Sequence, residues 1–134
     1  MRDTPQKLHP GNTVRTRELG KSGEQAAGRY LESLGCRIVA RNYRTRQGEV
    51  DLIALDGETV VFAEVKTRRS QRAGTGAESV TARKQEHIIR AALAFLQERG
   101  LEEAPARFDV IELLYAREGF RIRHIRDAFG STGF

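Results

Sequence analysis

Residues 49–66 carry the sequence EVDLIALDGETVVFAEVK, in which two β-rich runs flank Asp56-Gly57. An Asp-Gly pair between two such runs is the strongest short-range signal for a β-hairpin. If Asp56-Gly57 forms a two-residue loop, Leu55 pairs with Glu58, and every further pair follows from that register. This stretch decides the fold, because it fixes two neighbouring strands of one sheet.

The register of this hairpin predicts which side chains share a face. It places Asp51 opposite Phe62, and Glu64 opposite Glu49. Because strand side chains alternate between faces, Asp51, Glu64 and Lys66 lie on one face together with Glu49. Asp51 and Glu64 become diagonal neighbours, roughly 5–8 Å apart at Cβ. A one-residue slip would break this shared face, so the register is part of the prediction.

The two faces of the hairpin differ in composition. One face is continuously apolar and needs a core to cover it, and it holds Val50, Leu52, Ala54, Val61, Ala63 and Val65. The Asp51 face is apolar over most of its length, and the acidic residues collect at the end away from the turn. Carboxylates beside apolar cover repel one another and lose hydration, and a bound cation resolves both problems.

The residue types on this face point to phosphodiester chemistry. Mg²⁺, or Mn²⁺ in its place, suits the two carboxylates, because such a cation takes oxygen ligands and keeps several of its own waters. Lys66 lies two residues beyond Glu64, where an ammonium group can orient an attacking water and stabilise negative charge at a phosphate. The parts together predict metal-assisted hydrolysis. The alternative is a solvated ion pair at a strand end.

The rest of the chain predicts one α/β domain with a mixed sheet and the order α-β-β-β-α-β-β. Ser22-Gly23-Glu24-Gln25 fits a capping box at the start of the first helix. The predicted elements are a helix at 22–34, strands at 37–44, 49–55 and 58–66, a helix at 80–99, and strands at 106–115 and 119–126. The domain spans 20–126, with a flexible basic arm at 1–19 and a loose tail at 127–134.

Bulk composition limits the partners and the compartment. The 134 residues carry a net charge of +5 with a sequence pI of about 9.9, which suits a polyanion such as nucleic acid or an anionic membrane surface. Cys36 is the single cysteine, so no disulfide can form within the chain. No apolar run approaches the roughly 20 residues of a membrane span. We therefore expect a soluble cytoplasmic protein that does not enter a membrane.

Two sequence segments resemble a known nuclease motif. Residues 48–54 (GEVDLIA) and 62–68 (FAEVKTR) resemble the PD-(D/E)xK motif, and they look most like the YraN-type family of predicted endonucleases. That family is similar to archaeal Holliday-junction resolvases. The resemblance covers about residues 18–115 and also takes in Gly23-Glu24, residues 41–44 and Lys84. Val50 stands where the motif has its proline, which does no chemistry.

The resemblance implies a fold, an activity and roles for particular residues. It implies a restriction-endonuclease-like domain that hydrolyses DNA, with branched or flapped DNA as candidate substrates and a homodimer as a candidate assembly. Asp51 and Glu64 would be metal ligands, and Lys66 would position water or stabilise charge. Glu24 would add a further ligand from the first helix, where it lies at the edge of the apolar stripe. Its alternative is an ordinary first-turn acid that the helix dipole favours.

Other polar residues around this site have more than one interpretation each. Glu49 is a further ligand, a residue that contacts a ligand, or an exposed charge. Lys84 and Gln85 face the site or DNA, or else they cap the second helix. The arginines of the loop after the hairpin suit a phosphate-contacting flap, or else a plain basic loop. The predicted nucleic-acid contacts are Arg41, Arg44, Arg46, Arg68, Arg69, Arg72 and Lys84.

Three functions fit the sequence. The first is the metal-dependent endonuclease. The second is a nucleic-acid-binding module without activity, which the same basic composition would support. The third is a protein-interaction subunit of a larger repair or uptake assembly, for which the sequence contains no identifiable signature.

Overall fold

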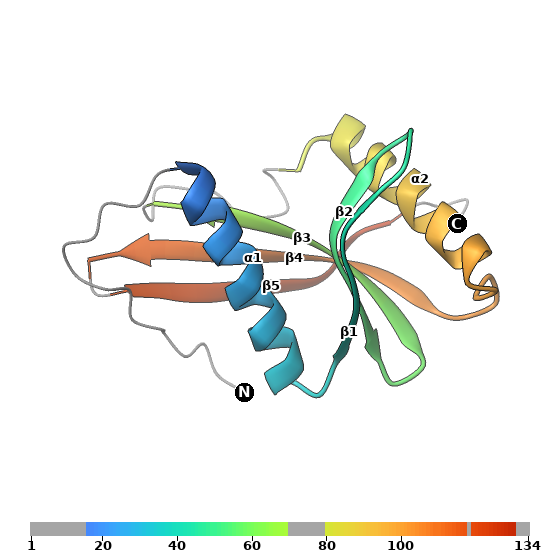
Figure 1. Ribbon diagram of the computed structural model, residues 1–134, viewed down its shortest axis with the longest axis horizontal. Coiled ribbons are helices and arrows are strands. Elements are labelled where there is room, and N and C mark those ends of the chain that lie inside the picture. The colour runs from blue at the N-terminus through green and yellow to red at the C-terminus, as the bar shows by residue number, and fades with distance from the viewer. Residues whose placement is uncertain (1–15, 70–79, 118, 131–134) are drawn as a thin grey trace.

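The computed structural model describes residues 16–69, 80–117 and 119–130, in the predicted order α-β-β-β-α-β-β. This order and the mixed α/β class are confirmed (Figure 1). The elements are α1 (Thr16–Ser33), β1 (Arg37–Arg44), β2 (Glu49–Asp56), β3 (Thr59–Arg68), α2 (Ala82–Glu98), β4 (Ala106–Ala116) and β5 (Gly119–Phe129). No helix in the described ranges is long and apolar enough to cross a membrane.

The five strands form one sheet in the order β1-β2-β3-β4-β5. Neighbouring strands are antiparallel except β3 and β4, which are parallel. A parallel pair needs a crossover connection, and α2 lies in that connection. Figure 1 shows α1 lying across the long strands while α2 lies beside the β1–β2 end of the sheet.

Each helix packs against the sheet through its own apolar cluster. Ala27 and Leu31 of α1 lie in a cluster with Leu52, Ala54, Val61 and Ala63, against which Val65 also packs, so the predicted apolar face of the hairpin is confirmed except for Val50. Phe95 of α2 packs edge-on against Phe62, which stacks on Phe108. Val50 belongs to this second cluster with Ile53. The side chains on both faces of the hairpin are therefore held by packing.

The predicted hairpin register is wrong by two residues. Asp56 pairs with Thr59, and Leu52 pairs with Ala63, so the turn consists of Gly57 and Glu58. Gly57 has a φ of 63°, and Glu58 is not among the non-glycine residues with positive φ. This is the pattern of a turn with glycine at its first central position, which is the other common two-residue hairpin turn. A shift of two residues preserves the alternation of faces, so Asp51, Glu64 and Lys66 still share a face, whereas Val50 packs in the second cluster instead of with Leu52 and Ala54.

The helix α1 begins earlier than predicted. It starts at Thr16, so Ser22 lies inside the helix and does not cap it. The stretch Arg17-Glu18-Leu19 has high helix propensity without an apolar period, and the helix continues through it on propensity. Inside the helix, a Cβ on Gly23 would lie 2.4 Å from Thr67 Oγ1, so the glycine permits α1 to approach β3 closely.

The last strand also extends past its predicted end at residue 126. The backbone N–H of Asp127 donates to Asp109 Oδ1 at 2.9 Å, and Phe129 stacks on Phe108. Residues 127–129 therefore belong to β5 and not to a loose tail. Both partners lie about twenty residues back along the chain, and the local sequence gives no sign of them. The predictions for residues 1–15, most of the loop after β3 and residues 131–134 lie outside the described residues.

Candidate functional site

Two buried carboxylates meet where the β2–β3 ladder ends. Asp51 is 8% exposed and Glu64 is 3% exposed. The pairing of Leu52 with Ala63 is the last in the ladder, and continuing it by one residue brings Asp51 opposite Glu64. The backbone N–H of Val65 donates to Asp51 Oδ2 at 2.8 Å. The two side chains are therefore direct neighbours and not the diagonal pair that the predicted register implied.

The proximity of these carboxylates changes their acidity. Burial raises the pKa of Asp51 to about 7, and the charge of Glu64 and a hydrogen bond between the two side chains act in the same direction. The Val65 N–H and the charge of Lys84 oppose this rise. Two carboxyl groups in such a position share a proton near neutral pH unless a cation compensates their charge.

Two lysines contact the same oxygen of Glu64. Lys84 Nζ lies 3.0 Å from Glu64 Oε2, and Lys66 Nζ lies 3.9 Å from it. Burial lowers the pKa of Lys84, but its hydrogen bond to Glu64 and the nearby carboxylates outweigh burial and raise it. Lys84 therefore stays protonated, and of its two predicted alternatives the structure places it at the site.

The polar neighbour Gln85 is placed differently. Its Nε2 donates to the Val80 carbonyl at 2.9 Å, while Thr81 Oγ1 caps α2 by accepting from the Lys84 N–H. Gln85 thus satisfies a carbonyl next to the helix start, which was the other alternative for these residues. Lys84 therefore faces the site, and Gln85 contacts the start of α2.

Glu24 and Glu49 lie at the rim of the carboxylate pair. Burial raises the pKa of Glu24, and the charges of Asp51 and Glu49 add to that effect, while a hydrogen bond with Asn42 lowers it. Glu49 is half exposed, with its Oε1 3.4 Å from Arg44 Nε. Asn42 has no predicted role, and it has a positive φ of 49° inside β1, a conformation that asparagine tolerates better than most residues.

The donor set fits a hard divalent cation only in part. In residues 16–69, 80–117 and 119–130, no three His, Cys, Asp or Glu side chains are arranged to hold a metal ion. The candidate ligands are therefore the adjacent pair Asp51 and Glu64. Glu24 lies close enough to them that the charge of Asp51 raises its pKa. Two carboxylates suffice for a cation such as Mg²⁺, which keeps several of its waters.

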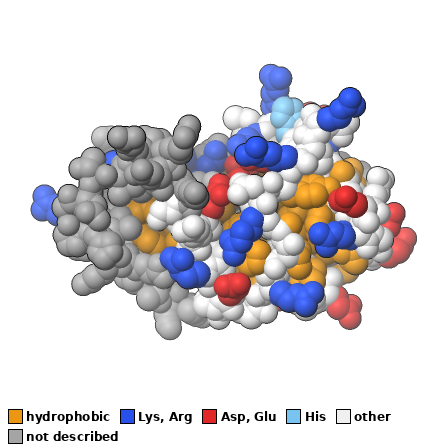
Figure 2. All heavy atoms as spheres, viewed as in Figure 1, with side chains coloured by type: hydrophobic (Ala, Val, Ile, Leu, Met, Phe, Trp, Pro, Cys, Tyr) orange, Lys and Arg blue, Asp and Glu red, His pale blue; other side chains and the backbone are white. Residues whose placement is uncertain are grey.

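The predicted basic contacts separate into paired and exposed residues. Arg68 Nε lies 2.6 Å from Oε2 of the fully buried Glu112, whose Oε1 also accepts from Arg123 Nε at 2.8 Å. Arg68 therefore compensates a buried charge and is not a free phosphate ligand. Arg41, Arg46 and Arg69 are exposed, and Arg72 lies outside the described residues. Figure 2 shows Lys and Arg side chains spread over the viewed face.

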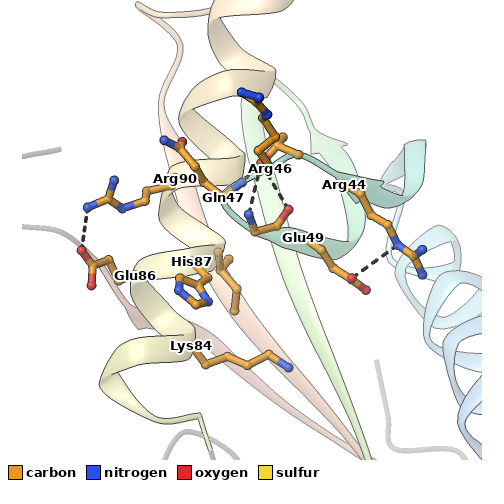
Figure 3. Close-up of a pocket in the computed structure, with 11 residues that line it drawn as sticks. Arg44, Arg46, Gln47, Glu49, Lys84, Glu86, His87 and Arg90 are labelled. Atoms are coloured by element: carbon orange, nitrogen blue, oxygen red, sulfur yellow. Dashed lines mark hydrogen bonds and ion pairs between the residues drawn. The ribbon is translucent and has the colours of Figure 1, made fainter.

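A groove opens beside the carboxylate pair. Its volume is about 700 Å³, and Figure 3 shows it between the β1–β2 turn and the first half of α2. Lys84 and Glu49 line the groove and also border the carboxylate pair. The remaining lining residues are Arg44, Thr45, Arg46, Gln47, Gly48, Glu86, His87, Ile88 and Arg90. Of these, the sequence interpretation missed His87 and Arg90, whose only signal was their helical spacing from Lys84.

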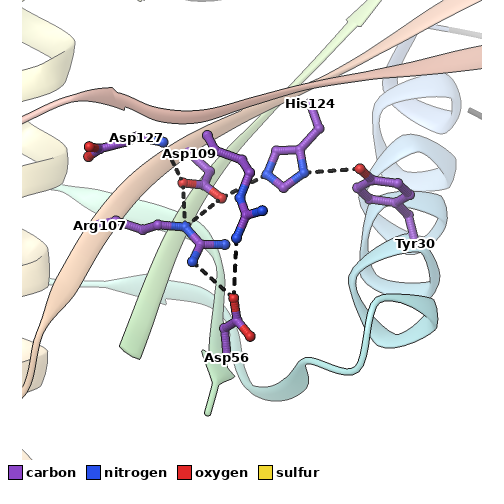
Figure 4. Close-up of polar contacts among 7 residues, drawn as sticks. Tyr30, Asp56, Arg107, Asp109, His124 and Asp127 are labelled. Carbon is purple, nitrogen blue, oxygen red and sulfur yellow. Dashed lines mark hydrogen bonds and ion pairs between the residues drawn. The ribbon is translucent and has the colours of Figure 1, made fainter. Parts of the chain in front are cut away.

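A second polar cluster lies outside this site and ties α1 to β5 (Figure 4). Asp109 accepts from Arg107 Nε at 3.1 Å and lies 2.7 Å from His124 Nε2, while Tyr30 Oη lies 3.0 Å from His124 Nδ1. Burial raises the pKa of Asp109, but its hydrogen bonds with His124, the Asp127 N–H and Arg107 lower it overall. Every contact described here joins protein groups, which indicates a structural role for Asp109.

The comparisons with known proteins show the family. The model of the uncharacterised protein family UPF0102 matches residues 23–113. The chain belongs to UPF0102. This is the YraN-type family that the sequence resembles, so that expectation is confirmed. The matched residues include Glu24, Asp51, Glu64, Lys66 and Lys84.

Several UPF0102 proteins are similar over nearly their whole length. The one from Symbiobacterium thermophilum is 50% identical over 115 residues, which are 85% of this chain and 98% of that protein. The one from Chlorobium chlorochromatii is 48% identical and covers 91% of this chain and 97% of its own. Among solved structures, Pyrococcus furiosus SfsA in complex with Ca²⁺ matches with a TM-score of 0.40 and 18% identity, covering 83% of this chain and 63% of that one.

Proposed function

We propose that this UPF0102 protein is a divalent-metal-dependent endonuclease that hydrolyses DNA. The observation that supports this most is the contact of two buried carboxylates, Asp51 and Glu64, with two lysines at one oxygen of Glu64. A protein that needed only a stable core would gain by replacing such a pair with apolar residues. A buried pair of neighbouring carboxylates with a perturbed pKa is typical of a functional site.

Asp51 and Glu64 would hold Mg²⁺ or Mn²⁺, and Glu24 would add a carboxylate from α1. A cation bound there supplies a Lewis acid for the phosphate oxygen and lowers the pKa of a bound water. The Val65 N–H donates to Asp51 Oδ2 at 2.8 Å and so fixes the orientation of the Asp51 carboxylate. Burial of both carboxylates strengthens their interaction with any cation.

The two lysines would provide the positive charge that the reaction requires. Lys66 and Lys84 bracket Glu64 Oε2 and are partly exposed, so both ammonium groups can reach a phosphate at the surface of the site. Positive groups fixed where negative charge develops lower the barrier without reorganisation. Lys84 also joins the site to the groove, where the flanking part of a substrate can lie.

The test is cleavage of flapped, branched, single-stranded and duplex DNA by the purified chain with Mg²⁺, Mn²⁺ or EDTA. We expect scission with either cation and none in EDTA. Asp51→Asn and Glu64→Gln should reduce the rate at least a hundredfold, which is the loss typical of a removed catalytic charge. Glu32→Gln is the matched control, because Glu32 is an exposed acid on α1. Cleavage that survives in both site variants would reject the proposal.

The alternative is a nucleic-acid-binding module without catalysis. It is favoured by the ion pair of Lys84 with Glu64, which satisfies that carboxylate without a cation, and by the lack of a third ligand among the described residues. It predicts salt-sensitive binding of DNA without strand scission, unchanged in Asp51→Asn and Glu64→Gln. Binding with no cleavage under any cation would favour it.

A further inference from the structure

The groove beside the site has walls of different kinds. One wall is the turn at residues 45–48, and the other is the part of α2 from Lys84 to Arg90, where the Arg90 side chain extends toward Glu86 (Figure 3). One end of the groove meets Glu49 and Lys84, both of which interact with the carboxylate pair or its rim. A substrate whose reacting phosphate lies at Asp51 and Glu64 therefore has the groove as a continuation of its path.

The turn that forms one wall is held in a single conformation. Thr45 Oγ1 accepts from the backbone N–H groups of Gln47 and Gly48 at 3.0 and 3.2 Å, and the Thr45 N–H donates to the Gly48 carbonyl at 2.8 Å. A Cβ on Gly48 would lie 2.0 Å from the His87 carbonyl oxygen. The turn therefore rests directly on α2, and the groove exists before any ligand binds, which reduces the entropic cost of binding.

Cations outnumber carboxylates along this groove. The lining contains four basic side chains and two carboxylates. The basic residues are Arg44, Arg46, Lys84 and Arg90, and the acidic ones are Glu49 and Glu86. Arg44 pairs with Glu49, and Arg90 pairs with Glu86 at 2.8 Å, so each guanidinium group is oriented by one carboxylate and keeps further N–H donors for a second partner. Arg46 is exposed, and no ion pair joins it to another described residue. The surplus of positive charge suits an anionic ligand.

The lining residues also limit how a nucleic acid can be held. Among the described lining residues the one aromatic ring is His87, so the groove has no row of rings on which successive bases could stack. Its volume of about 700 Å³ lies in the range of small-ligand sites, which suits a single strand better than the full width of a duplex. Arginine and backbone N–H groups are the usual contacts to phosphate oxygens, and these contacts do not depend on sequence.

We propose that this groove holds the sugar-phosphate backbone of one DNA strand next to the reacting phosphate, with Arg46 and Arg90 contacting its phosphates. This inference rests on the proposed function for the position of the reacting phosphate. It adds that the substrate enters as an unpaired strand, as in a flap, and that recognition is independent of base sequence. Two further basic residues line the groove, namely Arg44, which pairs with Glu49, and Lys84, which pairs with Glu64 of the carboxylate pair.

The test measures binding without catalysis. Anisotropy of fluorescein-labelled oligothymidine is followed in EDTA for the wild type, for Arg46→Glu/Arg90→Glu and for Arg37→Glu/Arg121→Glu. The last variant changes the charge equally at two exposed arginines that do not line the groove. We expect the groove variant to bind at least tenfold more weakly than the control variant. Replacing Arg46 and Arg90 by alanine should reduce the slope of log affinity against log salt by about 1.4.

A duplex probe of the same length tests the strand preference, and circular dichroism confirms that the variants fold. Wild-type binding of the duplex should be weaker and should depend less on Arg46 and Arg90. Three results would overturn the inference. They are an equal loss of oligothymidine affinity in the groove and control variants, a duplex affinity that depends equally on Arg46 and Arg90, and no binding of oligothymidine by the wild type. Binding that depends on the groove, in a protein that cuts no DNA, would support this inference while rejecting the nuclease. DNA cleavage by a protein whose DNA binding does not depend on Arg46 and Arg90 would support the nuclease and reject this inference.

Discussion

Lys84 Nζ lies 3.0 Å from Glu64 Oε2 and so joins the first turn of α2 to the buried end of β3. Glu64 comes from the hairpin that bears both carboxylates, and Lys84 from the crossover helix that the parallel pair β3–β4 requires. The position of α2 therefore completes the site.

Removing Lys84 should weaken the protein when no cation is present. In Lys84→Met the buried Glu64 keeps only the more distant Lys66, at 3.9 Å. Because Lys84 is half exposed, we expect a loss of only about 1 kcal/mol in the free energy of unfolding. Urea unfolding in EDTA measures it, with the neighbouring exposed Arg83→Met as control. If both variants unfold at the same urea concentration, Lys84 does not compensate Glu64.

The raised pKa of Asp51 predicts a stability that falls with pH. The folded protein holds the proton to about pH 7, whereas the unfolded chain releases it near 3.8. Between these values the folded state binds more protons, so the free energy of unfolding decreases as pH rises. Asp51→Asn removes this contribution, because the neutral amide keeps an acceptor for the Val65 N–H.

In EDTA at about pH 8, Asp51→Asn should therefore be more stable than the wild type by about 1–2 kcal/mol, as functional sites often sacrifice stability. The difference should shrink toward about pH 5, where the wild-type pair holds its proton. Denaturant titrations at both pH values measure it. A variant that is less stable than the wild type at both pH values would mean that the Asp51 carboxylate is already compensated.

Gly48 should not tolerate a side chain. A Cβ there would lie 2.0 Å from the His87 carbonyl oxygen, which belongs to the backbone of α2 and cannot rotate away. Gly48→Ala should cost about 1–3 kcal/mol, the usual range for overpacking. Gly130→Ala is the control, because nothing lies within 4 Å of its added Cβ. Thermal unfolding compares the two, and equal melting temperatures would show that the turn does not rest on α2.

Asp109 should matter for stability and not for the metal. Its carboxylate accepts from Arg107 and the Asp127 N–H and contacts His124, while it is fully buried. Asp109→Asn leaves charged partners only partly satisfied and should cost about 3 kcal/mol, as for a broken buried pair. Because the pKa of Asp109 is lowered, its contribution is present above the unfolded pKa and is lost as the pH falls through the folded one. Mn²⁺ affinity of the folded variant should match the wild type, and a tenfold loss would place Asp109 in the site.

The shared face of Asp51, Glu64 and Lys66 could be predicted from the sequence even though the register could not. Side chains alternate with period two, so an error of two residues leaves the faces unchanged. The turn was ambiguous because Gly57 fits as the second residue of Asp-Gly or as the first residue of Gly-Glu. The choice between them depends on how β3 pairs with β4 as well, which is not local.

The contacts between distant elements could not be predicted. The sequence leaves Lys84 and Gln85 equivalent, and only the docking of α2 turns one toward Glu64 and the other toward the Val80 carbonyl. The sequence around Arg68 suggests a contact with DNA, because its partner Glu112 lies on another strand and the residues near Arg68 in the sequence do not indicate that ion pair. The early start of α1 and the late end of β5 have the same origin, since sheet contacts and propensity override the apolar period there.

The most direct test of the central claim is Mn²⁺ binding followed by electron paramagnetic resonance, in the wild type, Asp51→Asn, Glu64→Gln and the exposed-acid control Glu32→Gln. The carboxylate pair predicts one saturable Mn²⁺ site that Mg²⁺ displaces, present in the wild type and in Glu32→Gln. Both site variants should lose at least tenfold in affinity, because each removes one of two adjacent charged ligands. Equal Mn²⁺ binding by all four proteins, or none by the wild type, would contradict a metal site at Asp51 and Glu64.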